Sequence, residues 1–138
     1  MKDNILLLLT PIAFLAYLTD DMTIRQALEK MKVHGYTVLP VIGETSGKYI
    51  GSISVSDLLN FITAKETISL KDLEQKNITS IIREDFMPPM KVSASLENLV
   101  NLITYQNYVP IIDDRHILMG IVTRKSVINY LSENKKIK

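Results

Sequence analysis

The chain has 138 residues, of which 46% are hydrophobic and 22% are charged, and its formal net charge is +1. This length and composition predict a folded protein of about one domain with a hydrophobic core. A general nucleic-acid binder is excluded, because such a protein needs a strong excess of basic residues. The chain contains no cysteine, which excludes disulfides, thiolate metal sites and cysteine nucleophiles. Its two histidines are too few for an all-histidine metal site.

An uncharged stretch over residues 5–18 lies near the start of the chain. It is shorter than the roughly 20 residues that a membrane-spanning helix needs. Behind Lys2 it could form the core of a signal peptide, but Pro11 interrupts it and no A-x-A cleavage pattern follows. We therefore predict a short helix over residues 4–9 and a buried strand over residues 12–18, with the proline at the break.

The next segment predicts an amphipathic helix that occurs twice. Thr23 and Gln26 form a capping-box pattern, and Ser95 begins the second occurrence. Behind each cap, apolar residues follow the spacing i, i+3, i+4 and i+7 of one helix face. These residues are Ile24, Ala27, Leu28 and Met31 in the first copy, and Leu96, Leu99, Val100 and Ile103 in the second.

The elements that follow are repeated as well. Residues 39–42 and 109–112 are apolar runs with one proline, which predict strands. A polar turn, a strand with one glycine and a closing helix come after each. The sequence thus predicts an α/β fold of two β-α-β-β-α repeats that pack as a pseudo-twofold pair, because one unit alone is too small to bury its sheet. We assign the repeats to residues 1–63 and 78–138, and residues 64–77 to a charged connector with a short helix over residues 70–76.

The two closing helices differ in charge at their starts. In the first copy we take Ser56 as the N-cap and Asp57 as a first-turn carboxylate, which suits the positive end of a helix. In the second copy Arg124 and Lys125 occupy that turn and oppose the helix dipole. Together with the Thr123 hydroxyl and free backbone N–H groups, they form a candidate phosphate site. The alternative is that both cations point into water at a small energetic cost.

The turn before the first proline-containing strand is the third candidate. Gly35 fits the position that ends a helix, and His34 in the last turn has a structural role there. Tyr36 is either an aromatic residue at a strand start or a ring on which an adenine base stacks. The basic residues Lys135, Lys136 and Lys138 are predicted to form a solvated tail.

The duplicated segments, residues 23–31, 35–42 and 49–59 and their counterparts 95–103, 108–112 and 119–131, resemble a tandem pair of cystathionine-β-synthase (CBS) domains, a Bateman module. The resemblance implies a cytoplasmic, non-enzymatic regulatory module that binds adenine nucleotides in the cleft between the copies. In such pairs a serine or threonine contacts phosphate, and an aspartate three residues later contacts ribose hydroxyls. Ser54 and Asp57 match both positions, whereas Thr123 matches the first and Ser126 departs from the second.

The two copies differ in that residues 35–37 of the first are Gly-Tyr-Thr, whereas residues 123–125 of the second are Thr-Arg-Lys. This difference is similar to that in stand-alone CBS pairs of Gram-positive bacteria that bind cyclic di-AMP. Some members have a lysine where this chain has Phe14. The resemblance implies one ligand contacted by Ala16, Tyr36, Thr37, Thr123, Arg124 and Lys125, with Ser54 and Asp57 as ligand contacts in a second cleft. The alternatives are an AMP- or ATP-sensing pair that uses the second cleft, and a dimerisation module without a ligand.

The resemblance also implies partners. It implies a homodimer formed through apolar helix faces, and a protein effector for which a (p)ppGpp synthetase is the first candidate. It implies no catalytic residues, metal, cofactor, nucleic acid or membrane. The residues that we expect in the dimer surface include Leu58, Leu59 and Ile62.

Overall fold

The computed structural model describes the backbone of residues 4–137 and the side chains of residues 4–133. Lys2 and the predicted basic tail, Lys135, Lys136 and Lys138, lie outside the described side chains. The chain divides into two compact units: unit 1 comprises Met1–Leu15 and Met87–Lys138, and unit 2 comprises Ala16–Phe86. Each unit is described by itself below.

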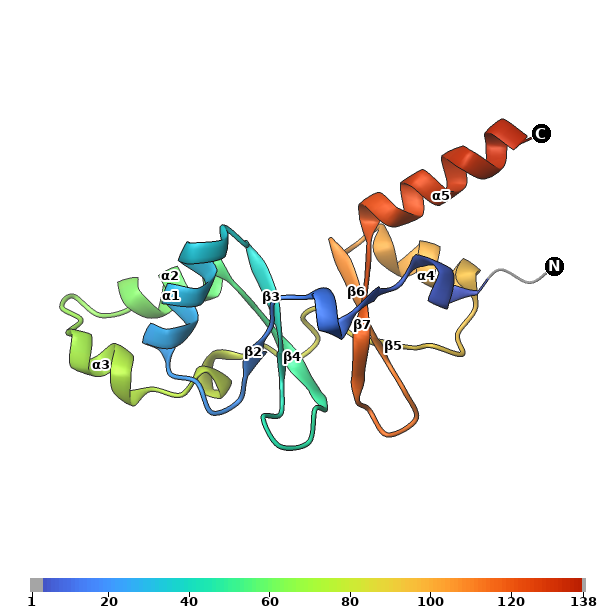
Figure 1. The fold of residues 1–138 in the computed structure, drawn as a ribbon. Helices are drawn as coiled ribbons and strands as arrows, with labels where there is room; N and C mark the ends of the chain where they lie inside the picture. The colour runs from blue at the N-terminus through green and yellow to red at the C-terminus, as the bar shows by residue number, and fades with distance from the viewer. Residues whose placement is uncertain (1–3, 138) are drawn as a thin grey trace. The chain divides into compact units, whose positions relative to one another are not determined.

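Unit 2 contains the first β-α-β-β-α repeat (Figure 1). Its sheet has the order β2-β3-β4, with β2 parallel to β3 and β3 antiparallel to β4. Helices α1 and α2 pack against the sheet, and the side chains of Leu18, Ile24, Val41, Ile53 and Leu58 are fully buried in this core. The elements are β2 (Leu18–Thr19), α1 (Ile24–His34), β3 (Val38–Ile42), β4 (Tyr49–Ser54), α2 (Val55–Thr63), α3 (Leu70–Gln75) and the 3-10 helix η3 (Ile78–Ile81).

Unit 1 contains the second repeat and the start of the chain. Its sheet has the order β1-β7-β6-β5, in which the N-terminal β1 pairs antiparallel with β7. The buried core joins Ile5 and Leu8 from the start of the chain to Leu99, Val109 and Val122 of the second repeat. The elements are η1 (Ile5–Leu8), β1 (Thr10–Pro11), η2 (Ile12–Phe14), β5 (Met90–Lys91), α4 (Leu96–Ile103), β6 (Tyr108–Ile112), β7 (Leu118–Thr123) and α5 (Arg124–Ile137).

Both repeats therefore have the β-α-β-β-α order that the sequence predicts, and the α/β fold class is confirmed. The repeat boundaries at residues 1–63, 64–77 and 78–138 stay a prediction. The compact units divide the chain differently, because the segment that precedes each repeat belongs to the unit of the other one.

The local signals that start and end α1 act as predicted. The amide of Gln26 donates to the Thr23 hydroxyl at 3.2 Å, and the Thr23 amide donates to the Gln26 side chain at 2.9 Å. Gly35 ends the helix with a left-handed φ of 68°, and its amide donates to the Met31 carbonyl at 2.9 Å. The predicted connector helix is also present as α3, which has a capping box formed by Ser69 and Asp72.

The predicted strand over residues 12–18 is wrong. Residues Ile12–Phe14 form a turn of 3-10 helix, because the Leu15 amide donates to the Ile12 carbonyl at 3.1 Å. Phe14 is 80% exposed, Ala16 packs against the core while only partly buried, and Leu18 at the end of the stretch is fully buried. The helix predicted over residues 4–9 is the 3-10 helix η1, which Asn4 caps. Within residues 4–137, no helix is long and apolar enough to span a membrane.

Candidate functional site

The first motif lies where β4 ends and α2 begins. The Asp57 amide donates to the Ser54 hydroxyl at 3.1 Å, and the Ser54 amide donates to the Asp57 carboxylate at 2.9 Å. Ser54 is therefore the N-cap, and the prediction of Ser56 is wrong: Ser56 is an exposed residue within the first turn. The reciprocal bonds that only Ser54 and Asp57 can make fix the helix start two residues earlier.

The Asp57 carboxylate forms an ion pair with an arginine that lies after the predicted connector. Arg83 Nε donates to Asp57 Oδ1 at 2.7 Å, and the Arg83 guanidinium lies 3.9 Å from the centre of the Phe86 ring. Burial by itself would raise the pKa of Asp57, but hydrogen bonds from the Ser54 amide, from Arg83 and from the Ser54 hydroxyl outweigh it and hold the pKa below its usual value. The carboxylate is therefore ionised and already paired.

The second motif lies at the corresponding junction of β7 and α5. The Ser126 amide donates to the Thr123 hydroxyl at 3.1 Å, so Thr123 caps α5 as Ser54 caps α2. No acidic residue lies in the first turn of α5, and Arg124 and Lys125 are both exposed there. This helix start therefore presents a hydroxyl and two cations, a combination that favours a bound anion.

Arg124 has a second contact that the sequence does not indicate. Its Nε donates to the carbonyl of Ile103, the last residue of α4, at 3.2 Å. A cation is favoured at a helix C-terminus. The contact with the end of α4 thus partly offsets the unfavourable position of Arg124 at the start of α5. The position of Arg124 therefore supports a bound anion less strongly than the sequence suggests.

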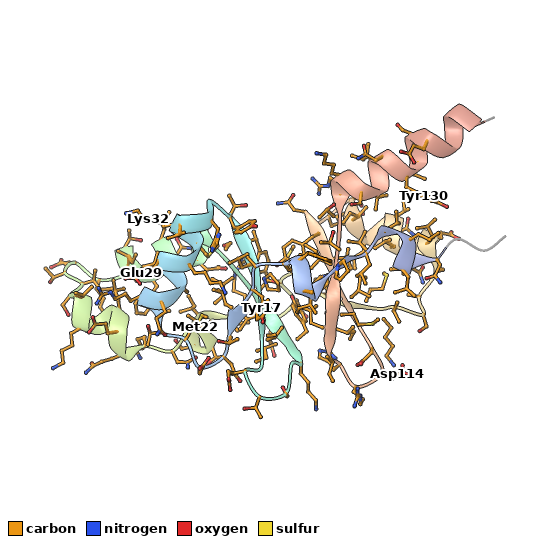
Figure 2. The ribbon with its side chains drawn as sticks, viewed as in Figure 1. Tyr17, Met22, Glu29, Lys32, Asp114 and Tyr130 are labelled. Carbon is orange, nitrogen blue, oxygen red and sulfur yellow. The ribbon has the colours of Figure 1, made fainter. Side chains whose placement is uncertain are left out.

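Tyr36 and Thr37 line a cavity of about 580 Å³ in unit 2. This volume lies within the range of small-molecule sites, roughly 300–1,000 Å³. Tyr36 is 45% exposed, and its ring centre lies 5.8 Å from that of His34 in a tilted arrangement. Two charged residues of α1, Glu29 and Lys32, project from that helix in Figure 2. The other lining residues are Leu28, Met31, Gly35, Val55 and Leu58.

The predicted ligand contacts are distributed over both units. Ala16 packs against the core of unit 2 and does not line the cavity beside Tyr36 and Thr37. Thr123, Arg124 and Lys125 are adjacent in unit 1. Their joint role in one site stays a prediction. Sequence reasoning missed Arg83 and Phe86, because no short-range spacing links them to Asp57, which lies 26 residues before Arg83.

The CBS domain family model matches residues 10–64 and 71–133, so the chain belongs to the CBS domain family and carries two copies of the domain. Among curated proteins, it is 26% identical over 119 residues to the uncharacterized protein MJ1225 of Methanocaldococcus jannaschii. That match covers 79% of this chain but only 42% of the relative, so the chain spans less than half the length of MJ1225.

Several solved structures match almost the whole chain. The CbpB protein of Listeria monocytogenes, solved in complex with c-di-AMP, is 25% identical with a TM-score of 0.82, and the match covers 94% of this chain and 96% of that one. A hypothetical conserved protein from Geobacillus kaustophilus is 26% identical with a TM-score of 0.85, over 97% and 99% of the two chains. CBSX2, solved in complex with AMP, shares the fold at 23% identity and a TM-score of 0.76, over 96% and 98%.

Proposed function

We propose that this protein is a non-enzymatic sensor of an adenine nucleotide, cyclic di-AMP, and that the bound form regulates a partner enzyme. Two observations support the ligand. The start of α5 presents Thr123, Arg124 and Lys125, and no acidic residue lies in its first turn. A chain of the same fold and nearly the same extent, Listeria CbpB, was solved with c-di-AMP. The proposed contacts are Ala16, Tyr36, Thr37, Thr123, Arg124 and Lys125.

The chemistry of the ligand suits these side chains. Cyclic di-AMP has two phosphodiesters, whose negative charges match the cations at Arg124 and Lys125. Its 3′ oxygens are esterified, so a carboxylate for a free ribose diol is not needed, and Ser126 avoids repulsion between such a carboxylate and phosphate. The exposed ring of Tyr36 offers a surface on which an adenine can stack, an interaction worth about 1–3 kcal/mol per base.

Arg124→Ala tests the proposal most directly. Loss of a charge-assisted contact worth roughly 1.5–3 kcal/mol should weaken cyclic di-AMP binding about 10- to 150-fold in titration calorimetry. Arg124→Lys should recover part of the affinity, because an ammonium cannot form a bidentate fork. Without ligand, the melting temperature of Arg124→Ala should stay nearly unchanged. The lost hydrogen bond to Ile103 is offset because a cation that opposes the dipole of α5 is removed.

The control is Arg115→Ala, which removes an exposed arginine from the turn between β6 and β7. This variant should bind cyclic di-AMP as the wild type does. Equal affinities for wild type and Arg124→Ala, or a ligand-free Arg124→Ala protein that melts several degrees lower, would assign Arg124 a structural role and contradict the site.

A second candidate function is binding of AMP or ATP at Ser54 and Asp57. The complete serine–aspartate motif and its fixed geometry favour it. Asp57→Ala should then abolish AMP binding and leave cyclic di-AMP binding nearly intact. Loss of both ligands would contradict the assignment of two separate sites.

The third candidate is a dimerisation module without a ligand. A thermal-shift screen with AMP, ATP, S-adenosylmethionine and cyclic di-AMP separates it from the other two, since a ligand at 100 times its Kd adds about 2.7 kcal/mol of stability. The partner is tested with a (p)ppGpp synthetase, whose rate is measured with this protein in the presence and absence of cyclic di-AMP. A partner complex that is indifferent to every nucleotide would favour the third candidate.

A further inference from the structure

The Asp57 carboxylate has few acceptor positions left for a ligand. Its side chain is only 7% exposed. Oδ2 accepts from the Ser54 amide and the Ser54 hydroxyl, both at 2.9 Å, and Oδ1 accepts from Arg83 Nε at 2.7 Å. The two bonds from Ser54 belong to the cap of α2. An ionised carboxylate accepts about four hydrogen bonds, so about one position remains on Oδ1. A ribose diol that donates both of its hydroxyls to Asp57 therefore has to displace Arg83.

The surroundings of Arg83 stabilise its ion pair with Asp57 and also allow that pair to break. Its Nη2 lies 3.4 Å from Asp57 Oδ2, so the guanidinium faces both carboxylate oxygens, and the Phe86 ring lies 3.9 Å from it. Stacking on an aromatic ring adds to the attraction of the ion pair. At the same time the Arg83 side chain is 53% exposed, so it can turn into water without crossing the core.

The repeat itself supplies an internal comparison, because corresponding segments cover a glycine in each unit. In unit 1 the Leu9 side chain, directly after η1, lies 3.0 Å from the position of a Cβ on Gly120. In unit 2 the Ile82 side chain, directly after η3, lies 2.5 Å from the position of a Cβ on Gly51. Leu9 and Ile82 therefore occupy corresponding positions.

The residue after Leu9 and the residue after Ile82 differ between the units, and so does the third residue after the hydroxyl that caps the closing helix. Arg83 follows Ile82 and pairs with Asp57, whereas Thr10 follows Leu9 in the unit where Ser126 replaces the aspartate. Thr10 and Ser126 line a cavity of about 350 Å³ in unit 1. The arginine is thus present where the carboxylate is present, and the copy without either of them has open space at that place.

We infer that Arg83 is a specificity-determining residue that competes with ribose hydroxyls for Asp57 and so weakens binding of nucleotides with a free ribose at the first motif. This inference rests on the second candidate function above, AMP binding at Ser54 and Asp57. A ribose diol binds a carboxylate by donating its hydroxyls. Both hydroxyls bind Asp57 only after the Arg83 pair is broken, which reduces the net free energy gained on binding. The ion pair therefore biases the protein away from AMP and leaves a site that does not use Asp57 unaffected.

The test is titration calorimetry of the full chain with AMP and with 2′,3′-dideoxyadenosine monophosphate. Removal of a partly exposed ion pair in Arg83→Ala should tighten AMP binding about 2- to 5-fold. The dideoxy nucleotide, which has no ribose hydroxyls, should gain nothing. The double variant Arg83→Ala/Asp57→Asn should lose the gain. The matched control Arg25→Ala removes another ion-paired arginine of unit 2 and should bind AMP as the wild type does.

Unchanged or weaker AMP binding in Arg83→Ala, an equal gain for the dideoxy nucleotide, or no AMP binding in either protein would overturn the inference. If Arg83→Ala does not fold, Phe86→Ala removes only the stacked ring and should tighten AMP binding in the same direction by a smaller factor. Cyclic di-AMP titrations of the wild type and of Arg124→Ala test the proposed function separately, since neither result depends on Arg83.

Discussion

In the first motif, one carboxylate takes part in both a helix cap and an ion pair. Asp57 stabilises the start of α2 through Ser54 and at the same time neutralises Arg83. The sequence predicts a first-turn aspartate correctly, because the preference for acidic residues at helix starts is local. It does not predict Arg83, because a contact over 26 residues depends on how the segment after α3 returns to α2.

The cap of α2 shows the limit of local rules in another way. Ser54 and Ser56 are both acceptable N-cap residues, and both precede apolar residues of the helix face. The choice between them depends on the last pair of β3 and β4, in which Val38 lies opposite Ser54. The strand continues to Ser54, so the helix begins directly after it. A rule that considers only the helix cannot supply this information.

The buried phenol of Tyr49 predicts that the stability of the protein depends on pH in the alkaline range. Burial raises the pKa of Tyr49 to about 12, although the hydrogen bond with Ser52 acts in the opposite direction. Below about pH 10 the phenol is neutral in both states and contributes no pH dependence. Between pH 10 and 12 the unfolded state ionises first, so stability should fall by about 1.4 kcal/mol per pH unit.

Chemical denaturation at pH 9 and pH 11.5 measures this loss. In Tyr49→Phe the alkaline decrease should be smaller than in the wild type, because the buried phenol is gone. Tyr105→Phe is the matched control, since the Tyr105 side chain is 87% exposed, and it should follow the wild type. An equal fall in the free energy of unfolding from pH 9 to pH 11.5 in all three proteins would contradict the role of Tyr49.

Among the elements, the amphipathic helices are predicted from the sequence, whereas the short strand β1 is not. The helices α1 and α4 have caps and complete apolar faces, so the chain specifies them locally. The short strand β1 exists because Thr10 lies opposite Ile121 of β7, far away in sequence. Residues Ile12–Phe14 are equally apolar but form a turn of 3-10 helix, and only the end of the predicted strand, Leu18, pairs with β3. Apolar character alone does not distinguish these outcomes.

Gly120 gives the prediction for β1. A Cβ at this position would lie 2.1 Å from the Thr10 carbonyl oxygen, a backbone atom that cannot move without breaking the pairing of β1 and β7. Gly120→Ala should therefore destabilise the protein by about 1–3 kcal/mol and detach β1. Hydrogen exchange should be faster at the Thr10 amide, since Pro11 has none, and the melting temperature should be lower.

The control for Gly120→Ala is the corresponding substitution in the other repeat. In Gly51→Ala the new Cβ meets the Ile82 methyl group at 2.5 Å, and a side chain can yield more easily than a carbonyl. Gly51→Ala should leave exchange in β1 unchanged and cost less stability. If Gly120→Ala protects β1 as well as the wild type does, close packing at this glycine is not what the pairing requires.

At the scale of the whole molecule, the duplicated pattern allows the two-repeat fold to be predicted, but the segment preceding each repeat is assigned differently by the structure. Residues 4–15 lie in the unit of the second repeat, and residues 78–86 lie in the unit of the first. Periodicity describes how an element buries its own face and does not say which of two similar sheets receives a connecting segment. Arg83 belongs to such a segment, which is why the candidate site is only partly predictable from the sequence.

The helix surface of unit 2 bears on assembly. The sequence names Leu58, Leu59 and Ile62 as members of a dimer surface. Leu58 is fully buried in the core of unit 2 and is not available, so this part of the expectation is corrected. Leu59 is 52% exposed and Val33 on α1 is 78% exposed, so large apolar side chains do remain uncovered on these helices. A contiguous patch of such side chains is typical of a partner surface.

We predict that a second copy covers this surface and that the protein is a homodimer. Leu59→Asp places a charge on the uncovered face of α2, and the cost of burying that charge should shift the protein to monomer. Leu70→Asp is the matched control: Leu70 is 55% exposed on α3, and its substitution should leave the dimer intact. Light scattering at micromolar concentration, with thermal denaturation to verify folding, measures both variants. A wild type that is monomeric under these conditions, or equal dissociation in the two variants, would contradict assembly through α2.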